Sequence, residues 1–417
     1  MSTCSFCGAP LKLCLVDLGE TPLANSYLPP TPAAIAAEQR FPLRTMVCEQ
    51  CWLVQLDHEV PADAIFDHDY AYLSSYSESW VAHAKRYADT MIQRFDLGPD
   101  SLVIEVASND GYLLQHFREI GVPVLGVEPA GHAASVAEGK GVPSRVMFFN
   151  AETAKDLAAE GFKADLMAAN NVLAHVPDIK GFVAGFPRVL AAEGVVTFEF
   201  PHLANLLEQV QFDTIYHEHY SYLSLLAVEA ILESAGMRVF DVEKLPTHGG
   251  SLRVFACHQS ASHKMTEALI AMRAEEQAAG LDSTEAYTGF AARVASLRDG
   301  FLRFLADAKA AGLKVAAYGA AAKGNTFLNF CGVGAEDIIA VADRNPEKQN
   351  RLLPGSHVPV VSPGTLLNMK PDRIVILPWN LREEIAHQMA EIGAYGGKFV
   401  TVDASAESSI TIFSPPV

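Results

Sequence analysis

The sequence predicts an α/β fold with a small N-terminal head followed by two Rossmann-like domains. Three observations lead to this prediction. Cysteine pairs are confined to the first 51 residues, and two series of short apolar runs that alternate with helical stretches begin near residues 101 and 314. Strands that alternate with helices are typical of a parallel sheet covered by helices. A chain of 417 residues is also too long for a single core, so two or three domains are expected.

The three expected parts are residues 1–75, 76–245 and 246–417. Strand-like runs in the head occupy residues 13–18 and 52–56. An amphipathic helix at residues 79–95 opens the central domain, whose expected strands are residues 102–106, 122–127, 166–169 and 194–200. In the C-terminal domain, two helices broken near residues 280–283 fill residues 264–310, and the expected strands are residues 251–258, 314–317, 338–342 and 373–377.

Composition and charge argue against several classes of function. Half of the residues are hydrophobic and 19% are charged, which is typical of globular domains. The net charge of −18 argues against nucleic acid as a partner, because phosphate binding needs a basic face. The sequence has neither an apolar run of membrane-spanning length nor a basic segment followed by the apolar core of a secretory signal. We therefore expect a cytoplasmic protein without a membrane partner, as a monomer or small homo-oligomer.

Two cysteine pairs, Cys4/Cys7 and Cys48/Cys51, have the spacing of metal-binding knuckles. The two-residue gap lets both sulfurs of a pair face one ion, and four thiolates complete a closed tetrahedral zinc site. No position then stays open for water, so the zinc is expected to be structural and to stabilise a head too short for a full core. The alternative is four unligated core cysteines, and Cys14 is expected to be a buried apolar residue.

Residues 102–114 have the pattern of a strand, a tight turn and a helix start. Such a loop brings backbone N–H groups close to a ligand. It lacks the G-x-G-x-x-G spacing that a dinucleotide needs, and its carboxylates suit a cationic, amino-acid-bearing ligand better than a pyrophosphate. The expected cofactor-binding residues of this loop are Glu105, Ala107, Ser108, Asn109, Asp110, Gly111, Tyr112 and Leu113.

Further expected cofactor residues follow the next two strands of the central domain. Glu128 and Pro129 end the second strand, where a carboxylate grips the ribose diol in nucleoside-binding folds. Asn170 and Asn171 follow a later strand. Acidic residues at strand ends also serve as helix caps, but the order and spacing together favour a methyl-donor site for S-adenosylmethionine.

Residues 212–224 form the densest reactive stretch, with two histidines, three tyrosines and two carboxylates. The spacing differs from H-E-x-x-H, so it does not predict a metalloprotease. Carbon methylation requires the breaking of a C–H bond, and beside a ketone a histidine or tyrosinate can remove that proton. The resulting enolate needs a hydrogen-bond donor. The segment can supply both groups; the alternative is a polar helix whose aromatic residues pack on the core.

Taken together, these motifs resemble those of the sugar C-methyltransferases of deoxysugar biosynthesis, which act on dTDP-linked 4-keto sugars in antibiotic pathways. The resemblance covers nearly the full length. It rests on the four cysteines and on residues 105–114, 213–224, 248–253 and 318–326. It implies S-adenosylmethionine and structural zinc as cofactors and a dTDP-linked keto sugar as the substrate.

The resemblance also implies catalytic roles for particular residues. The family's catalytic base matches His219, its companions match Tyr216 and Glu218, and a further active-site histidine matches His175. An active-site tyrosine near the end of the head falls on Tyr70 or Tyr72. The chain departs from the family at Ala107, where the cofactor loop usually has glycine.

In the C-terminal domain, residues 315–326 repeat the strand, glycine turn and helix pattern, with a lysine in the turn as an anion site would have. Residues 343–345 and 377–380 end later strands on the same edge of the sheet. We expect the sugar nucleotide to dock along this edge, with a tryptophan stacked on its base or sugar. The expected substrate-binding residues are His248, Arg253, Gly319, Lys323, Asn325, Trp379 and Asn380.

The expected reaction is methyl transfer from S-adenosylmethionine to a ring carbon, C-3 or C-5, beside the ketone of a dTDP-linked 4-keto sugar. Three alternatives stay open at this point. They are a Rossmann-type sugar-nucleotide oxidoreductase that uses NAD, a methyltransferase acting on another small molecule or on protein or RNA, and a non-catalytic zinc-bearing scaffold.

Overall fold

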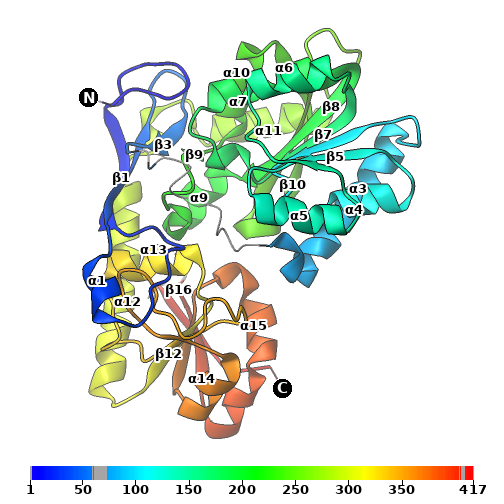
Figure 1. Cartoon of the computed structure of the whole chain (residues 1–417). Helices are drawn as coiled ribbons and strands as arrows, with labels where there is room; N and C mark the ends of the chain where they lie inside the picture. Colours follow the sequence, from blue (N-terminus) through cyan, green and yellow to red (C-terminus); the bar gives the residue numbers. More distant parts are fainter. Residues whose placement is uncertain (1, 59, 61–72, 403, 405–408, 417) are drawn as a thin grey trace.

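The computed structural model describes residues 2–58, 60, 73–402, 404 and 409–416. Tyr70 and Tyr72 lie outside these residues. Two α/β lobes stand one above the other, and the N-terminal head lies beside the upper lobe (Figure 1). The predicted α/β class, with a small head and two Rossmann-like domains, is confirmed. No helix of the described residues combines the length and apolarity needed to cross a bilayer.

The head is a small antiparallel sheet of β1 (Leu13–Thr21), β2 (Phe41–Val47) and β3 (Val54–Leu56), with the short helix α1 (Pro32–Ala36) between the first two strands. A fourth strand, β9 (Ser221–Tyr222), comes from the middle of the chain and pairs with β3. The head packs into two separate cores. Met46 and Leu53 join the core of the central domain, whereas Val47 and Val54 join a core shared with the C-terminal domain.

The central domain is a seven-stranded sheet in the order β10-β11-β8-β7-β4-β5-β6. Its strands are β4 (Val103–Val106), β5 (Val124–Val127), β6 (Ser144–Arg145), β7 (Ala164–Asn170), β8 (Leu190–Pro201), β10 (Met237–Leu245) and β11 (Ser251–His258). The pairs among β6, β5, β4, β7 and β8 are parallel, and β11 pairs antiparallel with both neighbours. Its helices are α3 (Glu78–Phe95), α4 (Leu114–Glu119), α5 (Gly131–Gly139), α6 (Ala151–Ala159), α7 (Ile179–Val183), α8 (Phe186–Val189), α9 (Leu203–Gln209) and α10 (Leu225–Ser234).

Alternation along the strands explains why helices cover both faces of this sheet. Val103 of β4 points into a core with α3, α4 and α5, and its neighbour Ile104 points into a core with α6, α7, α8 and α10. Successive strand residues face opposite sides, so a strand that is buried at every position needs a helical layer on each side. The helix expected at residues 79–95 is present as α3.

One expected element belongs to a different domain. Residues 251–258 were expected as a strand of the C-terminal domain, but β11 is inserted between β8 and β10 in the central sheet. The expected boundary at residues 245/246 therefore falls inside a β-hairpin. Antiparallel strands separated by a short turn pair locally, and that pairing takes β11 into the central sheet.

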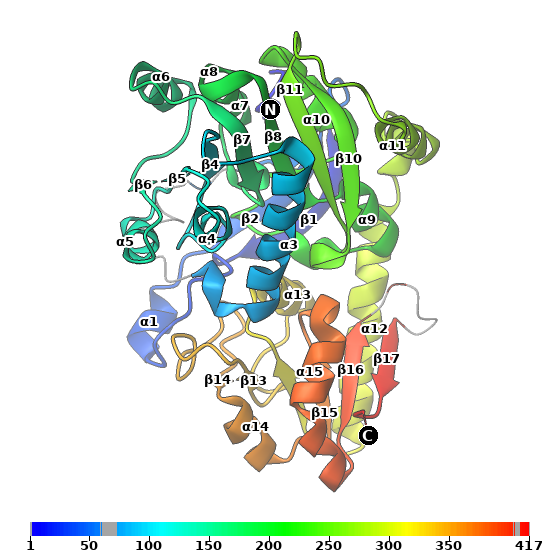
Figure 2. The ribbon, with the colours of Figure 1, turned by 90° about the vertical axis from the view of Figure 1, so that its right-hand side faces the viewer.

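The C-terminal domain is a six-stranded sheet in the order β14-β13-β12-β15-β16-β17, parallel except for β17. Its strands are β12 (Val315–Tyr318), β13 (Val341–Ala342), β14 (Val360–Val361), β15 (Arg373–Ile376), β16 (Lys398–Val402) and β17 (Ile410–Phe413). The expected pair of helices within residues 264–310 is present as α11 (Glu267–Ala278) and α12 (Phe290–Ala310). Of the two, α11 packs on β10 and α10, and its Leu269 and Met272 lie in the core of the central domain. The remaining helices are α13 (Ala322–Cys331), α14 (Pro363–Met369) and α15 (Arg382–Gln388). Figure 2 shows α12 alongside β16 and β17.

Short 3₁₀ turns carry several residues of the candidate site. They are η1 (Ser74–Tyr76), η2 (Leu173–His175), η3 (Phe212–Thr214), η4 (Thr247–Gly249) and η6 (Trp379–Leu381). Of these, η3, η4 and η6 meet where the central and C-terminal domains adjoin, because Trp379 donates a hydrogen bond to Asp213 and touches the Gly249 turn.

Candidate active site

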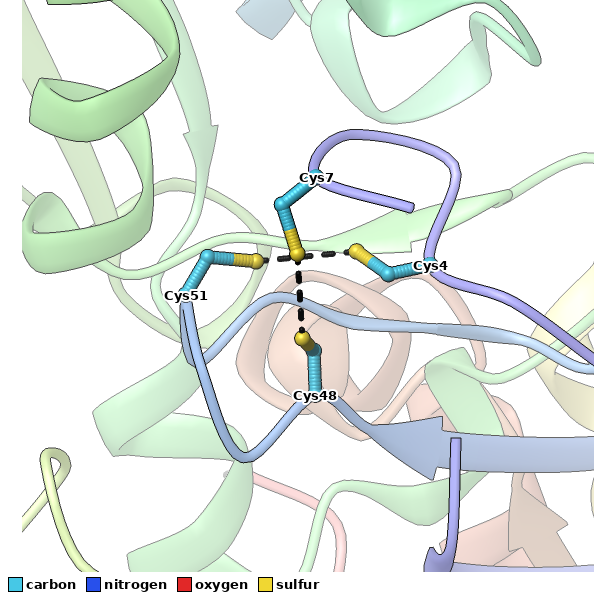
Figure 3. Close-up of side chains that lie close together, drawn as sticks. All are labelled: Cys4, Cys7, Cys48 and Cys51. Carbon is cyan, nitrogen blue, oxygen red and sulfur yellow. Dashed lines mark hydrogen bonds between the residues drawn. The ribbon is translucent and has the colours of Figure 1, made fainter. Parts of the chain in front are cut away.

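The four predicted zinc ligands converge at one point of the head (Figure 3). The sulfurs of Cys4 and Cys51, and those of Cys7 and Cys48, are 3.5 Å apart, and all four lie within 4.8 Å of one another. Tetrahedral zinc with bonds of about 2.3 Å separates its sulfurs by about 3.8 Å, so the site fits the ion. Cys14 is not part of the cluster, but the expectation that it is buried is wrong: it lies exposed on β1.

Matching turns shape the two knuckles. Gly8 donates its backbone N–H to the Cys4 carbonyl (2.9 Å), and Trp52 does the same to Cys48 (2.8 Å). Both residues have left-handed backbone angles, with φ of 77° and 59°. Glycine adopts this conformation without strain, whereas tryptophan at the second turn costs about 1–2 kcal/mol. Structural zinc sites contribute folding free energy that offsets a cost of this size.

In the cofactor loop between β4 and α4 the backbone takes repeated left-handed steps. Ala107, Asn109 and Gly111 have φ of 57°, 47° and 74°. Ala107 therefore occupies a position where a side chain is strained and where glycine would fit without strain. Gly126 of β5 lies close beside the loop, since a Cβ on it would approach the Ser108 Oγ to 2.5 Å.

Three buried polar groups of this loop point to a ligand. One oxygen each of Glu105 and Asp110, and the Ser108 hydroxyl, have no hydrogen-bond partner among the described residues. Buried polar atoms are normally satisfied, so these atoms fit a ligand that supplies donors, such as the amino group of an amino-acid moiety. Burial, Glu128 and Asp110 raise the pKa of Glu105 well above its usual range, which a cationic ligand would reverse.

The other predicted cofactor residues have mixed surroundings. Glu128 accepts the backbone N–H groups of Asn109 and Ala130, both at 2.8 Å, and a carboxylate with further lone pairs can still receive a diol. The second oxygen of Asp110 accepts hydrogen bonds from Ser75 and from Lys140 (2.9 Å), so this residue also anchors η1.

Side-chain roles differ among the remaining loop and strand-end residues. Leu113 is fully packed in the core between the sheet and α4, and Tyr112 stacks near Trp80 with ring centroids 6.2 Å apart. Asn170 accepts a hydrogen bond from Thr197 (3.4 Å). Asn171 takes a left-handed turn with φ of 55°. Pro129 is half-buried.

The histidine-tyrosine segment brings aromatic side chains together around His219. The rings of Tyr216 and His175 lie 4.0 and 4.7 Å from the His219 ring, and that of Tyr222 lies at 6.3 Å. The Nδ1 atom of His219 is 2.8 Å from the Thr214 carbonyl oxygen. A carbonyl only accepts, so Nδ1 carries the proton and donates it, and Nε2 keeps its lone pair. This is the tautomer that a general base needs.

The electrostatics of the site keep these imidazoles neutral. Burial, the neighbouring His175, and also His248 and Lys323 hold the pKa of His219 well below its usual range. Burial lowers the pKa of His175 to about 4, although the hydrogen bond to the Glu218 backbone acts in the opposite direction. Burial and Lys323 lower the pKa of His248 to about 4. At neutral pH all three rings are therefore uncharged, and each keeps a lone pair on one nitrogen.

Glu218, predicted as a catalytic companion, has its carboxylate on the side of the head. It accepts a hydrogen bond from Asn25 (2.5 Å), and burial raises its pKa. Sequence reasoning missed Asn25, because nothing in the spacing links residue 25 to residue 218. The carboxylate of Asp213, in the same segment, accepts the indole N–H of Trp379 at 2.7 Å.

The C-terminal domain contributes a cation and an aromatic ring to the same region. Lys323 lies over the Trp379 ring at 4.6 Å and donates to Asn380 at 2.9 Å. A cavity of about 700 Å³ lies next to them, lined by Asp213, Trp379, Arg293 and Arg382 among others. Gly319 has φ of 93° and touches Pro378 so closely that a Cβ would come within 2.3 Å of its ring.

Two predicted substrate-binding residues have part of their polar groups engaged elsewhere, whereas Nε of Arg253 and Oδ1 of Asn325 have no partner among the described residues. Arg253 is buried and donates to Glu199 (2.8 Å) and Glu243 (2.9 Å). Asn325 is buried and donates to the carbonyl oxygen of Ala24 (2.5 Å). His248, by contrast, faces the site: its Nδ1 has no partner among the described residues, and its φ is 54°.

Comparison with known proteins decides the family. The chain is 37% identical to the C-methyltransferase NovU of Streptomyces niveus over 397 residues, which is 95% of this chain and 94% of that protein. The chain belongs to the C-methyltransferase family. Three family models cover it in order: "Putative zinc binding domain" at residues 4–66, "Methyltransferase domain" at 80–242 and "C-methyltransferase C-terminal domain" at 246–402.

Solved structures of other methyltransferases align with less than half of this chain. Magnesium protoporphyrin IX methyltransferase from Synechocystis PCC 6803, with bound SAM, is 14% identical and aligns 43% of this chain with 82% of its own at a TM-score of 0.33. A methyltransferase from Thermotoga maritima described as a possible histamine N-methyltransferase is 16% identical and aligns 47% with 99% at 0.35. At these scores the likeness carries no argument about the reaction.

Family membership and the geometry confirm several predictions. The protein is an S-adenosylmethionine-dependent C-methyltransferase, and its four head cysteines form a cluster that fits structural zinc. The oxidoreductase and the non-catalytic scaffold are not supported.

Proposed function

We propose that this C-methyltransferase methylates a ring carbon beside the ketone of a dTDP-linked 4-keto deoxysugar, with His219 as the base. The observation that carries the proposal is the hydrogen bond from His219 Nδ1 to the Thr214 carbonyl (2.8 Å). It leaves Nε2 as a neutral acceptor in a site of low polarity, as proton abstraction from carbon requires.

When bound, S-adenosylmethionine supplies a methyl group on a positively charged sulfur. Carbon nucleophiles attack that methyl group. The residues of this chain then have the following roles. Nε2 of His219 takes the proton from the carbon beside the ketone, and the electron pair of that C–H bond moves to the ketone oxygen. Tyr216 and His175, whose rings flank His219 at 4.0 and 4.7 Å, orient or stabilise the enolate, with the Tyr216 hydroxyl as the hydrogen-bond donor. Fixing the two reacting carbons in contact contributes much of the rate.

The cofactor is proposed to bind along the β4–α4 loop and the end of β5. The orphaned atoms of Glu105, Ser108 and Asp110 support this assignment, with Glu128 for the ribose. Glu218, also predicted as a catalytic residue, is proposed to hold the segment that carries His219 in place. It is not proposed as a proton acceptor, because its carboxylate accepts a hydrogen bond from Asn25.

The nucleotide end of the substrate is proposed to lie against the C-terminal domain. Lys323 offers a cation beside the Trp379 ring, and the adjoining cavity of about 700 Å³ is lined by two arginines, which suits a diphosphate.

The free cysteines Cys257 and Cys331 support action in the cytoplasm, where thiols stay reduced.

The test is mass spectrometry of products from a panel of dTDP-4-keto sugars with S-adenosylmethionine. The wild-type enzyme should yield a sugar nucleotide heavier by one CH₂ unit, because the methyl group replaces a hydrogen, and His219→Asn should abolish turnover while still binding S-adenosylmethionine. The asparagine amide mimics the Nδ1 donor but cannot accept the proton. Near-normal turnover by His219→Asn would exclude His219 as the base, and no product from any keto sugar would exclude the proposed substrate class.

A further inference from the structure

The residues around His219 are held by the head as well as by the central domain that carries them. The backbone of Leu56 donates to the Tyr220 carbonyl (3.0 Å), and Gln55 pairs with Ser221 in the β3–β9 ladder. The Tyr220 hydroxyl donates to the Val60 carbonyl at 2.6 Å. The end of the catalytic segment, Ser221–Tyr222, thus forms the edge strand β9 of the head sheet, and its register follows β3.

Strand β3 is in turn tied to the metal centre by the side chain of Gln55. This side chain is buried, donates through Nε2 to the Cys4 sulfur (3.2 Å) and accepts the Ser5 backbone N–H through Oε1 (2.8 Å). Both ends of the amide are therefore bonded to the first cysteine knuckle. The second knuckle ends at Cys51, and only Trp52 and Leu53 separate it from β3. A metal-bound thiolate remains anionic and accepts such an N–H bond well.

We propose that Gln55 is a positioning residue that couples the zinc centre to the catalytic segment. The path is short: the Cys4 sulfur, the Gln55 side chain, the backbone ladder to Ser221, and His219 two residues earlier. With zinc in place, β3 and β9 are fixed, and the His219 ring keeps its place beside Tyr216. A displacement of about 1 Å in such a group can cost about 100-fold in rate. The inference rests on the proposed function for the role of His219.

The experiment compares Gln55→Glu with the control Gln277→Glu, which makes the same change on an exposed position of α11. Gln55→Glu keeps the shape of the side chain but places a carboxylate oxygen against the Cys4 sulfur. We expect zinc release to a chelator to be about 10-fold faster and kcat to be about 10-fold lower, with unchanged affinity for S-adenosylmethionine. A kcat equal to that of the control, or a joint loss of kcat and cofactor affinity, would overturn the proposal.

A second measurement uses the wild-type enzyme, in case Gln55→Glu does not fold. Zinc is removed with a chelator while two signals are followed: S-adenosylmethionine binding, and exchange of the substrate's acidic C–H hydrogen with deuterated water. Loss of exchange with retained binding supports the coupling. Exchange that persists without zinc, or binding and exchange lost together, contradicts it. The rate of zinc release from Gln55→Glu is measured without any sugar substrate. Its outcome can therefore be distinguished from a failure of the proposed function.

Discussion

Ala107 offers a direct test of how backbone strain is stored in the cofactor loop. Its φ of 57° lies in the left-handed region, which costs a non-glycine residue about 1–2 kcal/mol. Glycine removes this cost, but its more flexible unfolded chain loses more conformational entropy on folding, which costs about 0.5–1 kcal/mol. The side chain is only half-buried, so little packing is lost. Ala107→Gly should therefore stabilise the folded protein by about 0.5–1 kcal/mol.

The assay is urea unfolding, compared with Ala306→Gly as the control. Ala306 is exposed within α12, where glycine costs about 1 kcal/mol. The two variants should thus move the urea midpoint in opposite directions. S-adenosylmethionine affinity of Ala107→Gly should stay near the wild-type value if the loop keeps its path. Destabilisation of Ala107→Gly by as much as the control would refute the argument that strain is present.

Three further predictions concern charge and protonation. Lys323→Ala should raise the KM for the sugar nucleotide and leave S-adenosylmethionine binding unchanged, whereas an equal loss of both would argue against a substrate role; steady-state kinetics and calorimetry decide this. Burial raises the pKa of Glu199, but hydrogen bonding to His83 and the charge of Arg253 outweigh it and lower this pKa from 4.5 to about 2. The stability due to Glu199 is therefore fully present above about pH 4.5 and should be lost as pH falls toward 2, and Arg253→Met should remove much of this pH dependence in unfolding experiments. Because the pKa of His219 is lowered from 6.5, kcat/KM should stay constant down through pH 6.5; an acidic limb above that value would contradict the assignment of the base.

Much of the fold follows from local patterns in the sequence. The knuckle spacing of Cys4/Cys7 and Cys48/Cys51 needs only short loops to bring the sulfurs together, and the structure does so. Alternation of apolar runs with helical stretches located α3, α11 and α12 as well as the main parallel strands. Strand β11 was assigned to the wrong sheet because apolar periodicity identifies a strand but not its partner, which depends on the hairpin turn and on space between β8 and β10.

The candidate site was predictable only in part, for a similar reason. The reactive segment at residues 212–224 was evident from its composition, but the bond from Asn25 to Glu218 joins residues 193 positions apart. Arg253 of the 248–253 motif was predicted to bind the substrate. In the structure it pairs instead with the buried carboxylate of Glu199 near the end of β8. A charged residue in a motif has the same appearance in sequence whether it meets a substrate or a buried partner.

The two cores that share the head have a consequence for how the molecule loses its structure. Met46 and Val47 are neighbours on β2, yet one packs with the central sheet and the other with α12 and the C-terminal sheet. Unfolding either lobe would strip one side of the head and expose its apolar residues to water. The three parts should therefore melt in a single cooperative step, and a fragment cut at residue 75 or 245 would present bare hydrophobic surface and aggregate.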